Sequence, residues 1–208
     1  FKTFTQLQKY FLEKEKVEIN NFIKIYDNVI PVEVVSDIIA WSNKTSFEDA
    51  KIVGKSESVV DKKTRKTKSL VLDSNQKSLT NVHFARMLGN VFAEHIKKYF
   101  KDLEIPEQVE GIKAINDILI LKYEEGGHYM WHTDHAGGKI SRTLSCILFL
   151  NNDYEGGDLM FRYPNLKNER LINILPGRLI VWPSNFMYPH TVKPVTKGTR
   201  YSIVAWAD

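Results

Sequence analysis

Hydrophobic and polar positions follow different periods in the two parts of the chain. Before residue 112, apolar residues recur at helical spacing in residues 3–18, 32–42 and 79–100. Pro31 and the acidic residues after it favour a helix start at residue 32. From residue 112 onward, short apolar or alternating runs are separated by Gly and Pro turns. The pattern predicts helices first and a β-rich second part.

The β-rich part indicates a sandwich or barrel. Its predicted strands are residues 115–123, 142–150, 158–161, 171–175, 178–182, 190–194 and 200–206, and an earlier strand is predicted at 22–30. Residues 143–150 are apolar on both faces, so this strand needs cover on both sides. The upstream helices can supply that cover. We therefore expect a mainly β fold, a double-stranded β-helix (jelly roll), with the N-terminal helices packed outside.

The 208 residues fit one domain. Residues 1–111 are expected to form helical support and a substrate-side loop, and residues 112–208 the catalytic jelly-roll core. The loop is predicted at residues 54–69, where Val59 and Val60 are the only large apolar residues. Its cations indicate either a solvated stretch or a lid over a ligand; they are Lys62, Lys63, Arg65, Lys66 and Lys68.

Composition narrows the function classes. The chain is 43% hydrophobic and 26% charged, as in ordinary globular proteins. No apolar run approaches the roughly 20 residues of a membrane span, and residues 1–20 lack the apolar core of a signal peptide. Cys146 is the only cysteine and is expected to be a small buried hydrophobe in a reducing, cytoplasmic protein. The net charge of +4 is too small to indicate nucleic-acid binding.

Two histidines and an aspartate stand out as candidate metal ligands. His132 and Asp134 are two residues apart in WHTDH, so on an extended backbone their side chains project to the same side. His190 lies on a predicted strand near the end of the chain. A set of two His and one carboxylate leaves three positions of an octahedral iron open, which suits Fe(II) that binds a chelating cosubstrate and dioxygen.

Arg200 adds a candidate anion partner. It begins the last predicted strand, and alternation places Ser202, Val204 and Trp206 on its face. The guanidinium fork suits a carboxylate held by two hydrogen bonds. A dicarboxylate that chelates iron at its keto-acid end needs such a partner at its far end. The alternative is an edge-strand Arg paired with a surface acid.

Residues 115–208 resemble the 2-oxoglutarate/Fe(II) dioxygenases of the prolyl 4-hydroxylase superfamily, which includes bacterial peptidyl hydroxylases. The matching segments, in the family's order and spacing, are LKYEEGGHYMWHTD, RTLSCILFLN, DYEGGDLMF, PGRLIVWPS and PHTVKPVTKGTRYSIVAW. The resemblance implies metal ligands at His132, Asp134 and His190, and a 2-oxoglutarate carboxylate partner at Arg200. It covers nearly half of the chain, and residues 1–111 carry no diagnostic motif.

The same resemblance implies further contacts to the cosubstrate. Tyr123 is a second hydrogen-bond donor, and the pleat turns it away from Lys122 toward the face of Leu119 and Leu121. Phe149 stands where related hydroxylases can have a Tyr, so Tyr123 and Ser145 are expected to supply more of the polar contacts. Ser202 is expected to join them. A buried core tyrosine is the alternative for Tyr123.

Two residues match substrate-side positions of the family. Arg142 aligns with an Arg near the peptide substrate, and its alternative role is a salt bridge at the start of a strand. Trp206 aligns with a Trp near the reacting residue, and its alternative role is core packing. The other histidines considered, His83, His95, His128 and His135, are expected to have no role in the site.

The sequence thus predicts an oxygenase that needs Fe(II), 2-oxoglutarate and O2, with ascorbate as a further candidate. It would hydroxylate an unactivated C–H bond, with a prolyl residue in a peptide or protein as the favoured substrate. One alternative is an oxygenase acting on nucleic acid or on a free amino acid, although nucleic acid is not the expected partner. A remote alternative is a non-catalytic jelly-roll binding module. The oligomeric state stays open.

Overall fold

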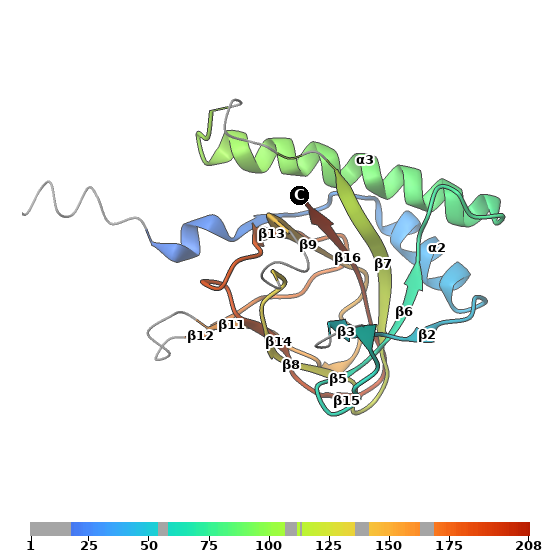
Figure 1. Ribbon diagram of the computed structural model, residues 1–208. Helices are drawn as coiled ribbons and strands as arrows, with labels where there is room; N and C mark the ends of the chain where they lie inside the picture. Colours follow the sequence, from blue (N-terminus) through green and yellow to red (C-terminus); the bar gives the residue numbers. More distant parts are fainter. Residues whose placement is uncertain (1–17, 54–57, 107–111, 113, 136–141, 163–168) are drawn as a thin grey trace, which may run out of the picture.

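The computed structural model describes residues 18–208 except 54–57, 107–111, 113, 136–141 and 163–168. Two β-sheets face each other, and helices cover the outer face of the larger one (Figure 1). The helices are the short 3-10 helix η1 (Ile19–Phe22), α2 (Val32–Ser42) and α3 (Leu79–Asp102).

All strand pairs in the sheets are antiparallel. The 7-stranded sheet has the order β1 (Lys24–Tyr26), β13 (Leu179–Pro183), β9 (Leu144–Phe149), β16 (Arg200–Ala207), β7 (Ile115–Tyr123), β6 (Lys68–Val71) and β2 (Glu48–Asp49). The 5-stranded sheet has the order β12 (Glu169–Leu171), β11 (Leu159–Arg162), β14 (His190–Val192), β8 (His128–His132) and β5 (Arg65–Lys66). Two short antiparallel pairs are also present: β10 (Glu155–Gly156) with β15 (Val195–Lys197), and β3 (Ile52–Val53) with β4 (Ser58–Val59).

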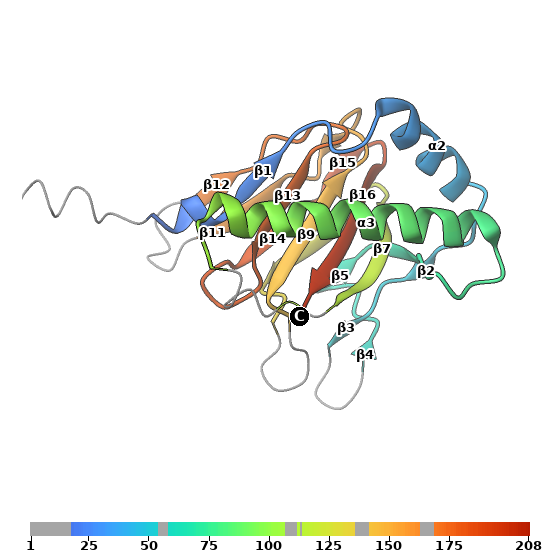
Figure 2. The same ribbon diagram turned by 90° about the horizontal axis from the view of Figure 1, so that it is seen from above.

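Helix α3 runs across the outer face of the larger sheet (Figures 1 and 2). Ser78 caps its start by accepting a hydrogen bond from the Asn81 backbone N–H at 3.3 Å. Its buried residues Phe84, Leu88, Phe92 and Ile96 recur every four positions, so they form one stripe facing the sheet. This stripe closes a first hydrophobic core between helix and sheet.

A second core lies between the two sheets, and β16 contributes to both cores. Ile203 and Ala205 face the helix side, whereas Val204 and Trp206 belong to the inter-sheet core. The alternation is the one expected of a strand buried on both faces. Alternation along β16 therefore places Arg200 and Ser202 on the face of Val204 and Trp206, as predicted, and this face points into the space between the sheets. The mainly β fold with a jelly roll and external helices is confirmed.

Several predicted boundaries differ from the structure. Helix α2 matches its prediction, and α3 continues to Asp102. The strand predicted at 171–175 is wrong: β12 ends at Leu171, where its pairing with Met160 of β11 ends. The strand predicted at 22–30 shortens to β1, because η1 precedes it and Asn28 adopts a φ of 55°. Residues 3–17 lie outside the described residues.

The prediction of an unstructured loop at residues 54–69 is partly wrong. Residues 54–57 lie outside the described residues, but the remainder contains β4, β5 and the start of β6. Strand β5 pairs with β8 through Arg65↔Tyr129 and Lys66↔His128. The low apolar content misled the prediction, because backbone pairing and burial of the Arg65 and Thr67 side chains hold this segment in place.

Cys146 is 1% exposed and packs in the core, as predicted, and burial raises the pKa of its thiol. Within the described residues, no helix has the length and apolarity that a membrane span requires.

Replacing Leu88 by Ala should lower the free energy of unfolding by about 2–5 kcal/mol, because the side chain is fully buried between α3 and the sheet and its loss leaves a cavity. Urea titrations followed by far-UV circular dichroism measure the change. Leu79→Ala is a matched control in the same helix, since Leu79 is 85% exposed and its truncation should cost no more than about 0.5 kcal/mol. Equal losses in both variants would contradict the packing described for α3.

Candidate metal centre

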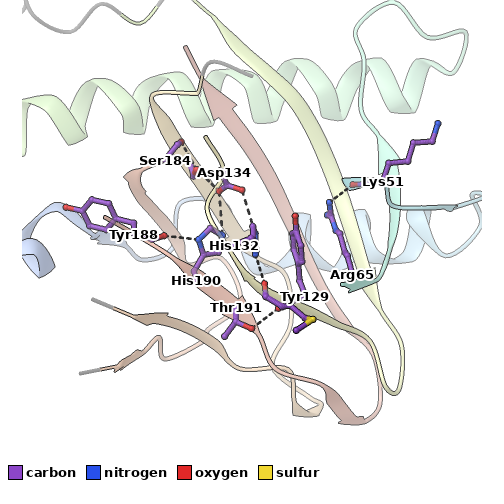
Figure 3. A network of polar contacts seen from close by, with 11 residues as sticks. Lys51, Arg65, Tyr129, His132, Asp134, Ser184, Tyr188, His190 and Thr191 are labelled. Carbon is purple, nitrogen blue, oxygen red and sulfur yellow. Dashed lines mark hydrogen bonds and ion pairs between the residues drawn. The ribbon is translucent and has the colours of Figure 1, made fainter. Parts of the chain in front are cut away.

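His132, Asp134 and His190 come together between the two sheets (Figure 3). His132 ends β8 and His190 begins β14, and the two residues are direct partners in the sheet. Asp134 Oδ1 lies 3.7 Å from His132 Nε2, and Oδ2 lies 3.6 Å from His190 Nε2. One nitrogen or oxygen from each residue lies within 4.8 Å of the other two. The three groups thus surround a space that one metal ion can fill.

A β-bulge aims two side chains of β8 into this space. His132 pairs with His190, but Val192 pairs with Tyr129, so three steps on β8 oppose two on β14. The Tyr129 and His132 rings consequently stack, with centroids 3.5 Å apart. Simple alternation would have placed these two residues on opposite faces. The bulge is therefore a feature that the sequence pattern does not reveal.

Backbone carbonyls fix the orientation of both imidazoles. His132 Nδ1 lies 2.8 Å from the Met130 carbonyl oxygen, and His190 Nδ1 lies 3.1 Å from that of Tyr188. Because a carbonyl only accepts, each Nδ1 carries the proton, and each Nε2 presents a lone pair to the space. Burial, and then the neighbouring His190, lower the pKa of His132 despite the opposing effect of Asp134. His132 is therefore neutral near pH 7.

Hydrogen bonding also fixes the carboxylate. Ser145 Oγ donates to Asp134 Oδ2 at 2.7 Å, and the Ser184 hydroxyl lies 2.7 Å from Ser145 Oγ. Burial raises the pKa of Asp134, but the two histidines and the Ser145 hydrogen bond outweigh it and leave that pKa lowered. Ser145 was expected to contact the cosubstrate; in the structure its hydroxyl contacts the carboxylate. Ser184 was not predicted, because its place beside Ser145 depends on the pairing of β9 with β13.

A cavity of about 230 Å³ adjoins the three residues. Tyr123 lines it, and Arg200 lies behind Tyr123 with its guanidinium carbon 5.0 Å from the ring centroid. The Arg200 side chain is 1% exposed, and its Nη1 donates to Ser202 Oγ at 3.1 Å. Among the described residues, Arg200 Nε and Nη2 have no hydrogen-bond partner. A buried cation with unused donors indicates a missing anionic ligand.

Other predicted residues lie at the same cavity. Arg142 and Trp206 both line it, and the Arg142 guanidinium lies 3.6 Å above the Trp206 ring. Arg142 also forms the salt bridge proposed as its alternative, with Asp117 at 3.3 Å. Phe149 is fully buried, and its ring lies 5.6 Å from the Arg200 guanidinium carbon.

Sequence reasoning missed a role for Tyr129 and Arg65 in the cavity wall. Strand alternation gave no signal for Tyr129, because it places this residue on the face opposite His132. None of the three candidate metal ligands lines a larger hollow of about 880 Å³ between α3 and β7, and the described residues contain no other cluster of potential metal ligands.

Known proteins resemble the part of the chain that contains these three residues. Residues 118–208 match the family model of the 2OG-Fe(II) oxygenase superfamily. A PKHD-type hydroxylase from Synechococcus sp. (strain CC9902) is 33% identical over 124 residues, covering 58% of this chain and 54% of the relative. The chain spans about half the length of the first curated relatives that it matches.

Solved structures share the fold. A prolyl-4-hydroxylase from Pseudomonas putida superposes with a TM-score of 0.66 at 19% identity, covering 89% of this chain and 91% of that one. A prolyl hydroxylase from Trichoplax adhaerens, solved with a peptide fragment of the hypoxia inducible factor oxygen degradation domain, gives a TM-score of 0.68 at 20% identity, with coverage of 99% and 93%. At these identities the likeness establishes the architecture.

Replacing His132, Asp134 or His190 by Ala should reduce Fe(II) affinity by more than the roughly 10- to 100-fold that is typical when an outer-shell partner of a metal ligand is lost. Anaerobic Fe(II) titration followed by calorimetry measures it, and circular dichroism checks that the variants fold. His83→Ala is the control, because His83 is exposed on α3. Wild-type affinity in any one of the three variants would remove that residue from the proposed ligand set.

Ser145→Ala should weaken Fe(II) binding by about 10- to 100-fold, because Asp134 loses the hydrogen bond that orients it. Ser145→Thr retains a hydroxyl and should recover most of the affinity. The same calorimetric titration compares the two variants. Equal weakening in both would point to a packing effect at this fully buried position and not to the hydrogen bond.

Proposed function

We propose that residues 118–208, which match the family model of the 2OG-Fe(II) oxygenase superfamily, belong to that superfamily, and that the protein is a Fe(II)- and 2-oxoglutarate-dependent hydroxylase of a prolyl residue in a peptide or protein. One observation carries the proposal. The cavity that contains the His132, Asp134 and His190 cluster is backed by the buried Arg200, whose Nε and Nη2 lack partners among the described residues. A metal-ligand set beside a buried cation with free donors suits a metal-chelating dicarboxylate.

The residues at this site fit the cofactor and the cosubstrate. His132 and His190 would hold Fe(II) through Nε2 and Asp134 through a carboxylate oxygen, because hydrogen bonds on the opposite sides of the three groups fix these orientations. Bound Fe(II) with 2-oxoglutarate and O2 supplies the oxidation that hydroxylates a C–H bond and yields succinate and carbon dioxide. Arg200, with Tyr123 and Ser202, would bind the far carboxylate of 2-oxoglutarate.

The remaining wall would position the substrate. Arg142, stacked on Trp206, lies at the cavity together with the apolar side chains of Leu119 and Val204. These groups exclude water from the reacting atoms and leave room for a small ring such as that of proline. The similarity to PKHD-type hydroxylases and the peptide complex of the Trichoplax adhaerens relative favour a peptide over the alternatives, which are a nucleic acid and a free amino acid.

The proposed function predicts succinate formation when the protein receives Fe(II), 2-oxoglutarate, O2 and ascorbate, and stimulation of this reaction by proline-containing peptides. Mass spectrometry should find one added oxygen atom on the prolyl residue. Peptides in which alanine replaces proline are the control. Oxygen incorporation into an oligonucleotide or a free amino acid, with none in any peptide, would replace the proposed substrate class.

Arg200→Ala should raise the apparent KM for 2-oxoglutarate by about 10-fold or more, because a charge-assisted contact is worth about 1.5–3 kcal/mol. The KM of Arg200→Lys should lie between those of Arg200→Ala and the wild type, since a lysine keeps the charge but lacks the forked guanidinium group. Initial rates of succinate formation give the KM values. Arg86→Ala, on the exposed side of α3, should leave KM unchanged. An unchanged KM in both Arg200 variants would place the carboxylate partner elsewhere.

A further inference from the structure

A second buried arginine faces the cavity from the opposite sheet. Arg65 projects from β5, is 8% exposed and lines the cavity that contains the metal-ligand cluster. Its guanidinium carbon lies 4.7 Å from the centroid of the Tyr129 ring, whose other face stacks on His132 (Figure 3). Arg65 is therefore separated from a proposed metal ligand by a single aromatic ring.

The hydrogen bonds of Arg65 are incomplete. Nη1 donates to the Lys51 carbonyl oxygen at 3.2 Å, while Nε is buried and has no partner among the described residues. An arginine stays charged at any physiological pH, so burial cannot neutralise it. The two carboxylates at the same cavity are engaged elsewhere: Asp117 pairs with Arg142, and Asp134 lies between the two histidines. Within the described part of the chain, no carboxylate forms an ion pair with Arg65.

A second hollow lies on the other side of Arg65. It has a volume of about 240 Å³, and Arg65 lines both hollows. Its other charged residues are Asp49, Lys62, Lys66, Lys68, Lys122 and Glu124. Lys62 pairs with Asp49 at 2.7 Å, and Lys68 and Lys122 both pair with Glu124, at 2.9 and 3.3 Å. Two carboxylates are thus shared by three of the four lysines, Lys66 bonds only to the Glu125 backbone oxygen among the described residues, and Arg65 is a buried cation of this hollow without an acidic partner there.

We propose that Arg65 binds a carboxylate of the peptide substrate and thereby selects peptides with an acidic group close to the residue that is hydroxylated. The inference rests on the proposed function and adds a substrate preference to it. The free Nε edge can form a charge-assisted contact with a carboxylate, and burial strengthens that contact relative to one in water. The short path from Arg65 through Tyr129 to His132 limits the acidic group to the neighbourhood of the reacting residue.

The surroundings of Arg65 favour an acidic peptide over a nucleic acid. A protein that binds the phosphate backbone of a nucleic acid needs several cations that are free to replace counterions. Three lysines of the second hollow already pair with carboxylates. Single-stranded nucleic acids also bind through base stacking, and no aromatic side chain lines the second hollow in the described part of the chain. A single carboxylate matches the single free arginine edge.

The test uses amidated peptides with one proline in a neutral background. One Asp is moved position by position along both sides of the proline, and each peptide has an Asn twin that differs only in charge. A further peptide carries a free C-terminal carboxylate in place of the Asp. Binding is measured by fluorescence polarisation with Mn(II) and 2-oxoglutarate under anaerobic conditions, and hydroxylation is measured separately by mass spectrometry with Fe(II). The binding measurement is independent of turnover.

In the wild-type protein, Asp at one or two positions near the proline should tighten binding by about 10-fold or more relative to its Asn twin, the range expected for one charge-assisted hydrogen-bonded contact. Arg65→Gln should abolish the difference between the twins, and Arg65→Lys should retain a part of it. Lys63→Gln removes a neighbouring charge that lines neither hollow and should retain all of it.

The wild-type comparison decides the matter even if Arg65→Gln does not fold. Equal binding of Asp and Asn twins at every position, together with no effect of the C-terminal carboxylate, would overturn the inference while hydroxylation of the prolyl residue would still support the proposed function. Oligonucleotide binding that falls steeply with salt and depends on Arg65 would also overturn it. Conversely, an acid preference without any prolyl hydroxylation would support the anion site and contradict the proposed function.

Discussion

The antiparallel pairing of β8 with β14 is the contact on which the site depends. It sets His132 directly opposite His190, although 57 intervening residues separate the two in sequence. The bulge in β8 then turns His132 and Tyr129 to the same side. A shift of one residue in this register would place one imidazole on the opposite face of the sheet and separate it from the other two ligands.

Ionisable groups can be buried here because each has a partner on the side away from the cavity. Both Nδ1 atoms donate to backbone carbonyls, and Asp134 accepts from Ser145. Their remaining polar atoms converge on one space, where a divalent cation would compensate the burial of the carboxylate. These hydrogen bonds end on the backbone carbonyls of Met130 and Tyr188 or on a fully buried serine, and they fix the orientation of all three side chains.

Two arginines provide the cavity with a charge pattern that the metal ligands alone would lack. Arg200 lies on the larger sheet and Arg65 on the smaller one, and both have guanidinium donors without partners among the described residues. Each unsatisfied donor costs free energy in the unliganded protein. The helices on the outer face of the larger sheet add the hydrophobic burial that offsets this cost, since β9 and β16 pack on α3 and against the inter-sheet core. Stability and ligand binding thus share the same strands.

The sequence by itself determined the chemical identities in the site and much of the fold. Periodicity located α2 and α3, and spacing within recognisable segments selected His132, Asp134, His190 and Arg200. The sequence did not predict strand β5 or the position of Arg65. This basic stretch has few apolar residues, and it is held in place by pairing with β8, some 60 residues away. The contact of Ser145 with Asp134, the contact of Ser184 with Ser145 and the bulge at Tyr129 likewise depend on register between distant strands. Local propensity carries no information about such register, so only the tertiary structure decided which polar atoms face the metal site and which donors remain free.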